Sequence, residues 1–167
     1  ESRPTTLKQR YINNSKSLLR VTNLQQHAIS EDMQNKIIRK LKSVLNNCDL
    51  LIFSDFNYGS LPQTLVDKAI QIAKKKSILC VADSQSSSQT GNIARFNNMD
   101  LILPTEREAR ISLRNNEDGL VVISDKIMKE SNSRYLILKL GADGILVEDS
   151  FARNSKIAND WYTDRLP

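Results

Sequence analysis

The chain has 167 residues, of which 40% are hydrophobic and 26% are charged, as in an ordinary globular domain. No stretch approaches the ~20 apolar residues of a membrane span, and no secretory signal is visible, so we expect a cytoplasmic protein with no membrane partner. The net charge of +5 is compatible with an anionic ligand but does not identify one. Because the chain opens on Glu1 and closes on Pro167 without a terminal helix, we expect both ends to be cut.

The first 22 residues are basic and predict two short strands. The apolar pairs 11–12 and 18–19 flank an Asn-Asn-Ser turn. Five of the first twenty residues are basic, among them Lys8 and Arg10, and such a run is most often a solvated face.

From residue 30 onward, helical patterns alternate with apolar runs. Ser30 is a candidate N-cap, and a helix follows it that ends at Asn46–Asn47 and whose apolar face is Met33, Ile37, Leu41 and Val44. A second helix covers about 61–76, with Leu65, Ala69 and Ile72 inward, and a third begins near Pro104. Strands are predicted at 48–53, 78–82, 99–103, 135–138 and 145–147. The alternation predicts an α/β fold with a parallel sheet buried on both faces.

Several residues have structural roles as their simplest interpretation. Cys48 and Cys80 lie in or beside predicted strands, so we expect both to be buried and reduced. His27 has no acid, cysteine or second histidine at a ligand-like spacing, which favours a polar or packing role over a metal site. Trp161 and Tyr162 are expected to pack against the core.

Polar residues follow the predicted strands, at the edge of the sheet where parallel α/β folds bind ligands. Asp55 and Asp83 end two strands, and each is either a loop cap or a ligand for a hydroxyl or a metal. Thr105 and Glu108 open a helix, where Glu108 either complements the helix dipole or holds Mg²⁺ through water.

The segment after the strand at 135–138 carries Lys139 and two glycines. Gly141 and Gly144 either form a hairpin turn or expose backbone amides to a nucleotide phosphate. The segment matches neither the G-x-G-x-x-G nor the P-loop pattern.

Four segments in this order resemble the PfkB carbohydrate kinases, and most closely their heptose-7-phosphate kinase branch, the kinase half of the bifunctional ADP-heptose synthases. They are R-P-T-T-L-K-Q-R (residues 3–10), S-D-F-N-Y-G (54–59), L-P-T-E-R-E-A (103–109) and K-L-G-A-D-G (139–144). The resemblance implies a Rossmann-like, three-layer, ribokinase-like sheet that is incomplete here. Residues 1–22 would form lid strands, and about 30–167 the nucleotide-binding core.

The same resemblance implies ATP and Mg²⁺ as cofactors and a sugar or sugar phosphate as partner. Lys8, Arg10, Asp55 and Asp83 would lie on the substrate side, and Glu108 would act on Mg²⁺ and phosphate. The nucleotide side would comprise Thr105, Lys139, Gly141 and Gly144. The family's catalytic aspartate lies in a G-A-G-D segment, which does not occur in these residues and is expected beyond Pro167. No catalytic residue is therefore expected in this chain, and the chain alone is expected to be inactive.

Three positions depart from the family pattern. Thr105 replaces an asparagine, Lys139 replaces a threonine, and Ser84–Gln85 replaces the Pro-Lys of many heptose-branch relatives. The last change removes a cation and with it one expected phosphate contact.

Two other functions compete with a kinase. One is a nucleic-acid-binding module that uses the basic N-terminal strands, which is disfavoured because aromatic residues make up only 5% of the chain and none alternate with the basic residues. The other is a non-catalytic scaffold derived from a kinase, forming a homodimer through its lid strands.

Overall fold

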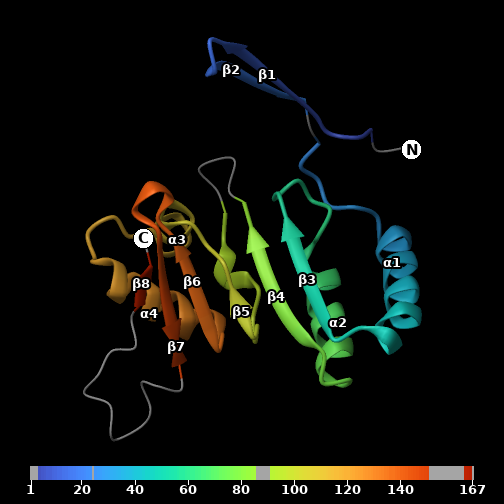
Figure 1. The fold of residues 1–167 in the computed structure, drawn as a ribbon. Coiled ribbons are helices and arrows are strands. Elements are labelled where there is room, and N and C mark those ends of the chain that lie inside the picture. The colour runs from blue at the N-terminus through green and yellow to red at the C-terminus, as the bar shows by residue number, and fades with distance from the viewer. Residues whose placement is uncertain (1–3, 24, 86–90, 151–163, 167) are drawn as a thin grey trace, which may run out of the picture.

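The computed structural model describes residues 4–23, 25–85, 91–150 and 164–166, and these form two sheets and four α-helices (Figure 1). Residues 161 and 162, predicted to pack against the core, lie outside the described residues. Within the described part, no helix is both long and apolar enough to cross a membrane.

The N-terminal hairpin, residues 7–23, consists of β1 (Leu7–Asn13) and β2 (Lys16–Asn23) and forms an antiparallel sheet of its own. The predicted turn is confirmed, and its residues Asn14 and Ser15 both have positive φ, as a tight hairpin turn requires. The strand register separates two faces. One face carries the apolar side chains Leu7, Tyr11, Leu19 and Val21, and the other carries Lys8, Arg10, Arg20 and Thr22.

The second sheet has six strands in the order in which they occur in the chain. They are β3 (Leu50–Asp55), β4 (Leu79–Ser84), β5 (Leu101–Ile102), β6 (Tyr135–Lys139), β7 (Ile145–Asp149) and β8 (Asp164–Leu166). β3 to β6 are parallel, whereas β7 and β8 are antiparallel to their neighbours. The predicted α/β fold with a mostly parallel sheet is therefore confirmed.

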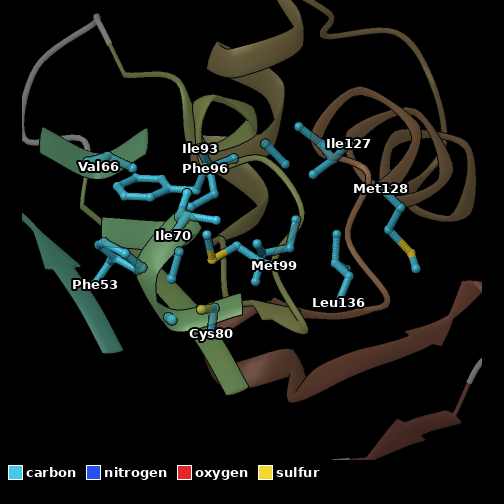
Figure 2. Packing of buried hydrophobic residues seen from close by; sticks show 14 of the residues in the cluster. Phe53, Val66, Ile70, Cys80, Ile93, Phe96, Met99, Ile127, Met128 and Leu136 are labelled. Atoms are coloured by element: carbon cyan, nitrogen blue, oxygen red, sulfur yellow. The ribbon is translucent and has the colours of Figure 1, made fainter. Parts of the chain in front are cut away.

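The core lies between the large sheet and the helices α2 (Gln63–Lys74), α3 (Glu106–Leu113) and α4 (Leu120–Ser131). Buried side chains from all of these elements form one cluster, of which Figure 2 shows Phe53, Val66, Ile70, Cys80, Ile93, Phe96, Met99, Ile127, Met128 and Leu136. The predicted inward positions of α2 are confirmed, since residues 65 and 69 are buried and Ile72 is partly buried.

The expectation that the sheet is buried on both faces is wrong at its β3 edge. Leu50 and Ile52 of β3 and Leu79 of β4 are 45%, 58% and 54% exposed, because no described element covers the face opposite α2. The alternate side chains of β3, such as Phe53, point into the core instead. Along β3 and β4 the described fold therefore has one open apolar face.

Helix α1 (Glu31–Val44) begins as predicted, with Ser30 Oγ accepting a hydrogen bond from the backbone N–H of Met33. Its predicted apolar face is wrong at three of four positions, because Met33, Ile37 and Val44 are exposed. The helix lies beside the β3 edge and contacts α2, so that Ile38 and Leu41 face the core instead (Figure 1).

The two cysteines differ in their surroundings. Cys80 is fully buried in β4, as predicted, and burial is the main reason that the pKa of its thiol lies above the usual value. The prediction that Cys48 is buried is wrong. This residue precedes β3 in an exposed stretch of extended backbone, and its thiol donates to the carbonyl of Val44 at 3.3 Å.

Candidate functional site

A crevice of about 800 Å³ lies between the hairpin and the carboxyl ends of the parallel strands. Its sheet side is lined by Thr105, Glu108 and Lys139, which were all predicted as site residues. The hairpin contributes its polar face, including the predicted Lys8 and Arg10. The remaining lining residues are Gln9, Arg20, Thr22, Tyr58, Gln85 and Arg107.

Lys139 connects two strand ends across the sheet. Its Nζ atom lies 2.8 Å from Oδ1 of Asp83, although 56 residues separate the two along the chain. Both side chains are about one-third exposed, so this ion pair contributes little to stability and mainly fixes where the ammonium lies. Asp83 does not line the crevice itself but holds Lys139, which does. Because lysine stands at position 139 instead of the family's threonine, the crevice wall carries a positive charge there.

Thr105 and Glu108 form a capping box at the start of α3. Glu108 donates its backbone N–H to the Thr105 hydroxyl at 3.2 Å, and its carboxylate accepts the backbone N–H of Thr105 at 2.7 Å. Pro104 precedes this cap rather than lying inside the first turn, since α3 begins at Glu106. Glu108 is only 8% exposed, yet it lines the crevice, so its carboxylate is held at a fixed position.

Gly141 and Gly144 lie in the turn that joins the antiparallel strands β6 and β7, so the hairpin-turn interpretation describes their backbone. Their φ angles of 66° and 87° favour glycine. A Cβ atom at Gly141 would meet nothing within 4 Å, which means that conformation rather than crowding requires glycine at this position. Neither glycine is among the residues that line the crevice, but both follow closely in the chain after Lys139, which does line it.

The carboxylate of Asp55 is engaged in a buried ion pair and does not line the crevice. Its Oδ2 atom lies 2.6 Å from Nη2 of Arg95, and its side chain is 2% exposed. Its Oδ1 atom accepts the backbone N–H of Asn57 at 2.9 Å. The Asn57 amide then donates to Ser84 Oγ and to the carbonyl of Gln85, at 3.2 and 3.0 Å. This network joins the ends of β3 and β4.

Arg95 and Asn57 therefore hold the ends of β3 and β4 without lining the crevice, and neither was predicted from the sequence. Arg95 lies 40 residues from its partner, in a short helical turn (Ile93–Arg95) with no polar pattern of its own. Asn57 could have been suspected, because its positive φ of 57° suits an asparagine that follows a strand end.

Lys8 places the hairpin against the loop after β3. Its Nζ atom lies 4.4 Å from the ring centroid of Phe56 and 4.9 Å from that of Tyr58. The two rings are themselves stacked, with centroids 6.1 Å apart. Basic and aromatic residues that do not alternate in the sequence thus meet in space, and a cation–π contact joins hairpin to sheet.

The oxygen donors of the crevice suit a magnesium ion held mainly by a substrate. Within the described residues no three His, Cys, Asp or Glu side chains cluster as a metal cage. Glu108 is nevertheless a fixed carboxylate at the crevice wall. Mg²⁺ usually takes one or two carboxylates together with waters and substrate phosphates, so these residues fit it only in company with a phosphorylated ligand.

Comparison with known proteins relates this chain to carbohydrate kinases. A model of the pfkB family of carbohydrate kinases matches residues 1–157. The bifunctional protein HldE of Wolinella succinogenes is 26% identical over 166 residues, which is 97% of this chain and 34% of that protein. The HldE of Helicobacter hepaticus is 28% identical over 152 residues, covering 89% and 31%. The chain thus spans about a third of the length of these curated relatives.

Solved structures show the same fold. The ribokinase of Giardia lamblia superposes with a TM-score of 0.70 at 15% identity, covering 98% of this chain and 51% of that one. Phosphofructokinase-2 of Escherichia coli in complex with fructose-6-phosphate gives 0.60 at 17% identity, covering 89% and 47%. At these identities the likeness establishes the fold alone.

Proposed function

The chain belongs to the pfkB family of carbohydrate kinases, and we propose that it is part of an enzyme that transfers the γ-phosphoryl group of ATP to a sugar hydroxyl. We further propose a sugar phosphate of the heptose type as acceptor. The heptose assignment rests on the four ordered segments that resemble the heptose-7-phosphate kinases. A cytoplasmic location, where ATP is available, is part of the proposal.

The observation that carries this proposal is the composition of the crevice. It joins a lysine and a fixed carboxylate at the strand ends to a basic hairpin face on the other side. Phosphoryl transfer depends mainly on positioning and on stabilising charge, and cations on two sides of one crevice suit that task. An 800 Å³ space is within the usual size of small-molecule sites.

Each residue then has a role on one side of the crevice. Lys139, held by Asp83, donates hydrogen bonds to nucleotide phosphate, and the open backbone at Gly141 leaves room for the nucleotide, with Gly144 ending the same turn. Thr105 fixes Glu108, whose carboxylate would hold Mg²⁺ through water. That ion, when bound with ATP, neutralises charge on the transferred phosphate.

The substrate side is formed by the hairpin and by the β3–β4 loops. Lys8 and Arg10 bind the acceptor, and Asp55 contributes by fixing the loop beneath it. We also propose that the hairpin forms a homodimer through its apolar face, which leaves the basic face in the crevice.

Nucleotide binding without turnover is the expected behaviour of the 167-residue chain. These residues contain no G-A-G-D sequence, so we propose that no group here removes the proton from the acceptor hydroxyl. We expect a non-hydrolysable ATP analogue with Mg²⁺ to raise the melting temperature, since a ligand that binds only the folded state stabilises it. Lys139→Met should abolish most of that shift, whereas Lys126→Met, which removes a lysine paired with Asp118 away from the crevice, should not.

Two results would contradict the proposal. The first is the absence of any thermal shift with the magnesium–nucleotide at millimolar concentration. The second is a steep, salt-dependent affinity for single-stranded DNA or RNA that the nucleotide does not affect, which would favour the nucleic-acid alternative. Measurable phosphorylation of a sugar by the chain would overturn the statement that it lacks a catalytic base.

A further inference from the structure

We propose that a second cavity, at the end of α3, binds a small oxyanion that also carries hydroxyl groups, and that this ligand tightens nucleotide binding in the crevice. The cavity has a volume of about 590 Å³, which is within the usual size of small-molecule sites. It shares no lining residue with the crevice. The site itself goes beyond the proposed kinase function, whereas its effect on the nucleotide rests on that function.

Four segments of the chain form the polar walls of this cavity. The side chains are Gln26 in the linker between the hairpin and α1, Asn57 after β3, Asn92 and Arg95 around the short helical turn, and Ser112 and Arg114 at the end of α3. Ser112 Oγ donates to Asn92 Oδ1 at 2.6 Å, which ties α3 to the segment before the helical turn. Tertiary contacts therefore hold the walls in place.

The charge of the cavity favours an anion. Among the described residues its lining includes two arginines and no acidic side chain. Arg95 is neutralised by Asp55, whose Oδ2 atom lies 2.6 Å from Nη2. The guanidinium of Arg114 makes no ion pair or side-chain hydrogen bond with any residue that the structure describes. One positive charge is thus uncompensated, and a guanidinium can bind a carboxylate or a phosphate through two hydrogen bonds.

The backbone at Arg114 also indicates that its side chain has a use. This residue ends α3 in the left-handed conformation, with a φ of 51°. Glycine or asparagine is usual at such a helix end, because a longer side chain adopts this conformation only at a cost. A positive charge near the helix C-terminus is the simpler reason for an arginine, but Arg110 already supplies one in the last turn. We attribute Arg114 to the cavity that it lines.

The side-chain amides of the cavity suit hydroxyl groups. Asn92 accepts the Ser112 hydroxyl through Oδ1, while its Nδ2 atom donates to no described residue. Gln26 makes no side-chain hydrogen bond within the described residues. An amide offers both donors and acceptors, which matches the donor and acceptor capacity of a hydroxyl group. A ligand with hydroxyl groups beside its anionic group can therefore bind both the amides and Arg114.

Two segments connect the cavity to the crevice. Asn57 lines the cavity, and its side-chain amide donates to the carbonyl of Gln85 at 3.0 Å. Gln85 lines the crevice. Gln26 belongs to the linker that carries the hairpin, the other wall of the crevice. A ligand that contacts Asn57 and Gln26 holds both segments in place, which lowers the cost of ordering them when the nucleotide binds.

The test measures binding to the isotope-labelled 167-residue chain by nuclear magnetic resonance. The probes are sn-glycerol 3-phosphate as a phosphate ester, citrate as a hydroxy acid and glycerol as an uncharged analogue. Arg114→Asn removes the guanidinium and introduces a residue that suits the positive φ. Arg39→Gln is the matched control, because it removes an exposed arginine of α1 that lines neither the cavity nor the crevice.

We expect one of the two anions to shift the amide resonances of Asn92 and Ser112 until the cavity is saturated, and glycerol to shift them much less. Arg114→Asn should weaken that binding about tenfold, as for the loss of one charged hydrogen-bonding group. Arg39→Gln should bind as the parent does. The melting temperature of Arg114→Asn without ligand should be unchanged or higher, because asparagine suits the left-handed position, whereas a merely structural arginine would lower it when replaced.

The effect on the crevice is measured by titrating the magnesium complex of a non-hydrolysable ATP analogue with and without the saturating anion. We expect the anion to tighten nucleotide binding about fivefold in the parent and to have no effect in Arg114→Asn. If the anion binds and the nucleotide affinity does not change, the site stands and its effect on the crevice is wrong. If the anion binds but no nucleotide does, the kinase proposal fails together with this effect, and the site still stands.

The site is wrong if neither anion shifts the resonances of Asn92 and Ser112 at millimolar concentration, or if glycerol binds as well as the anions do. It is also wrong if Arg114→Asn binds the anion within twofold of the parent, or if Arg39→Gln loses as much affinity. An anion that shifts only the resonances of Thr105 and Lys139 binds in the crevice, and that result overturns the second site as well.

Discussion

Gly59 decides how the segment after the hairpin approaches the large sheet. Its φ is +77°, and a Cβ atom at this position would lie 2.2 Å from the backbone oxygen of His27. The carbonyl of Gly59 in turn accepts the backbone N–H of Ile29 at 3.0 Å. Because the contact is with main chain rather than with a flexible side chain, the neighbour cannot move aside without shifting the whole linker.

We therefore expect Gly59→Ala to lower the free energy of unfolding by about 2 kcal/mol or more, through backbone strain and this clash. Urea unfolding followed by circular dichroism measures the change. Gly119→Ser is the control, because a Cβ atom there meets nothing within 4 Å and serine suits the N-cap of α4. If both variants unfold at the same urea concentration as the parent, the linker is not held as described.

The sequence predicted individual site residues better than their partners. Thr105, Glu108 and Lys139 were found because polar residues after parallel strands gather at one edge of the sheet. The ion pair of Asp55 with Arg95 was not, because no local period relates residues 40 positions apart. Tertiary packing alone creates that contact, and it also turns Asp55 away from the crevice lining.

At the scale of elements, the sequence pattern predicted the hairpin, α1, α2 and the parallel strands. It did not predict α4. The apolar face of α1 was misplaced because an amphipathic pattern shows that a helix has an apolar side but not which neighbour covers it. β5 is shorter than predicted, since only Leu101–Ile102 pair as strand while Met99 packs in the core.

One ion pair links the end of α2 to the sheet. Lys74 Nζ lies 2.7 Å from Oδ2 of Asp100, which also accepts the backbone N–H of Cys80 at 2.7 Å. Burial raises the pKa of Asp100, but the hydrogen bonds from Lys74, Cys80 and its own backbone, together with the positive charge of Lys74, outweigh it, so that the pKa lies below its ordinary value. The pair joins the helix end to the start of β5.

Because the folded-state pKa of Asp100 is lowered, its contribution to stability is present above the unfolded pKa of about 3.9 and is lost as pH falls through the folded pKa. We expect Asp100→Asn to cost about 1 kcal/mol at pH 7, after allowance for the partly exposed pair, and much less near pH 2.5. Urea unfolding at the two pH values tests this. The control is Asp32→Asn, which removes an exposed pair with Lys36 and should show a smaller effect. If the cost of Asp100→Asn does not change with pH, the ion pair with Lys74 is not the source of the stability.

At the scale of the whole molecule, the described residues leave one apolar surface uncovered on each of the two sheets, besides the exposed side of α1. One is the open face at the β3 edge, with Leu50, Ile52 and Leu79. The other is the outer face of the hairpin, where Leu7, Tyr11, Leu19 and Val21 are each at least 41% exposed. A two-stranded sheet is marginally stable alone in water, so the hairpin has the greater need of a partner. The hairpin is also held to the large sheet by the contact of Lys8 with Phe56 and Tyr58.

If the hairpin is the dimer interface, Leu19→Lys should convert the chain to a monomer, because it places a charge at the centre of the apolar face opposite Tyr11. Sedimentation velocity at several protein concentrations measures the change. Ile37→Lys, on the exposed side of α1, is the control and should sediment as the parent does. Two results would rule out the hairpin as the interface. One is a parent chain that stays monomeric at all concentrations. The other is a dimer that is dissociated by Ile37→Lys but not by Leu19→Lys. The crevice should keep its affinity for the magnesium–nucleotide in Leu19→Lys, since Leu19 lies on the face opposite Lys8 and Arg10.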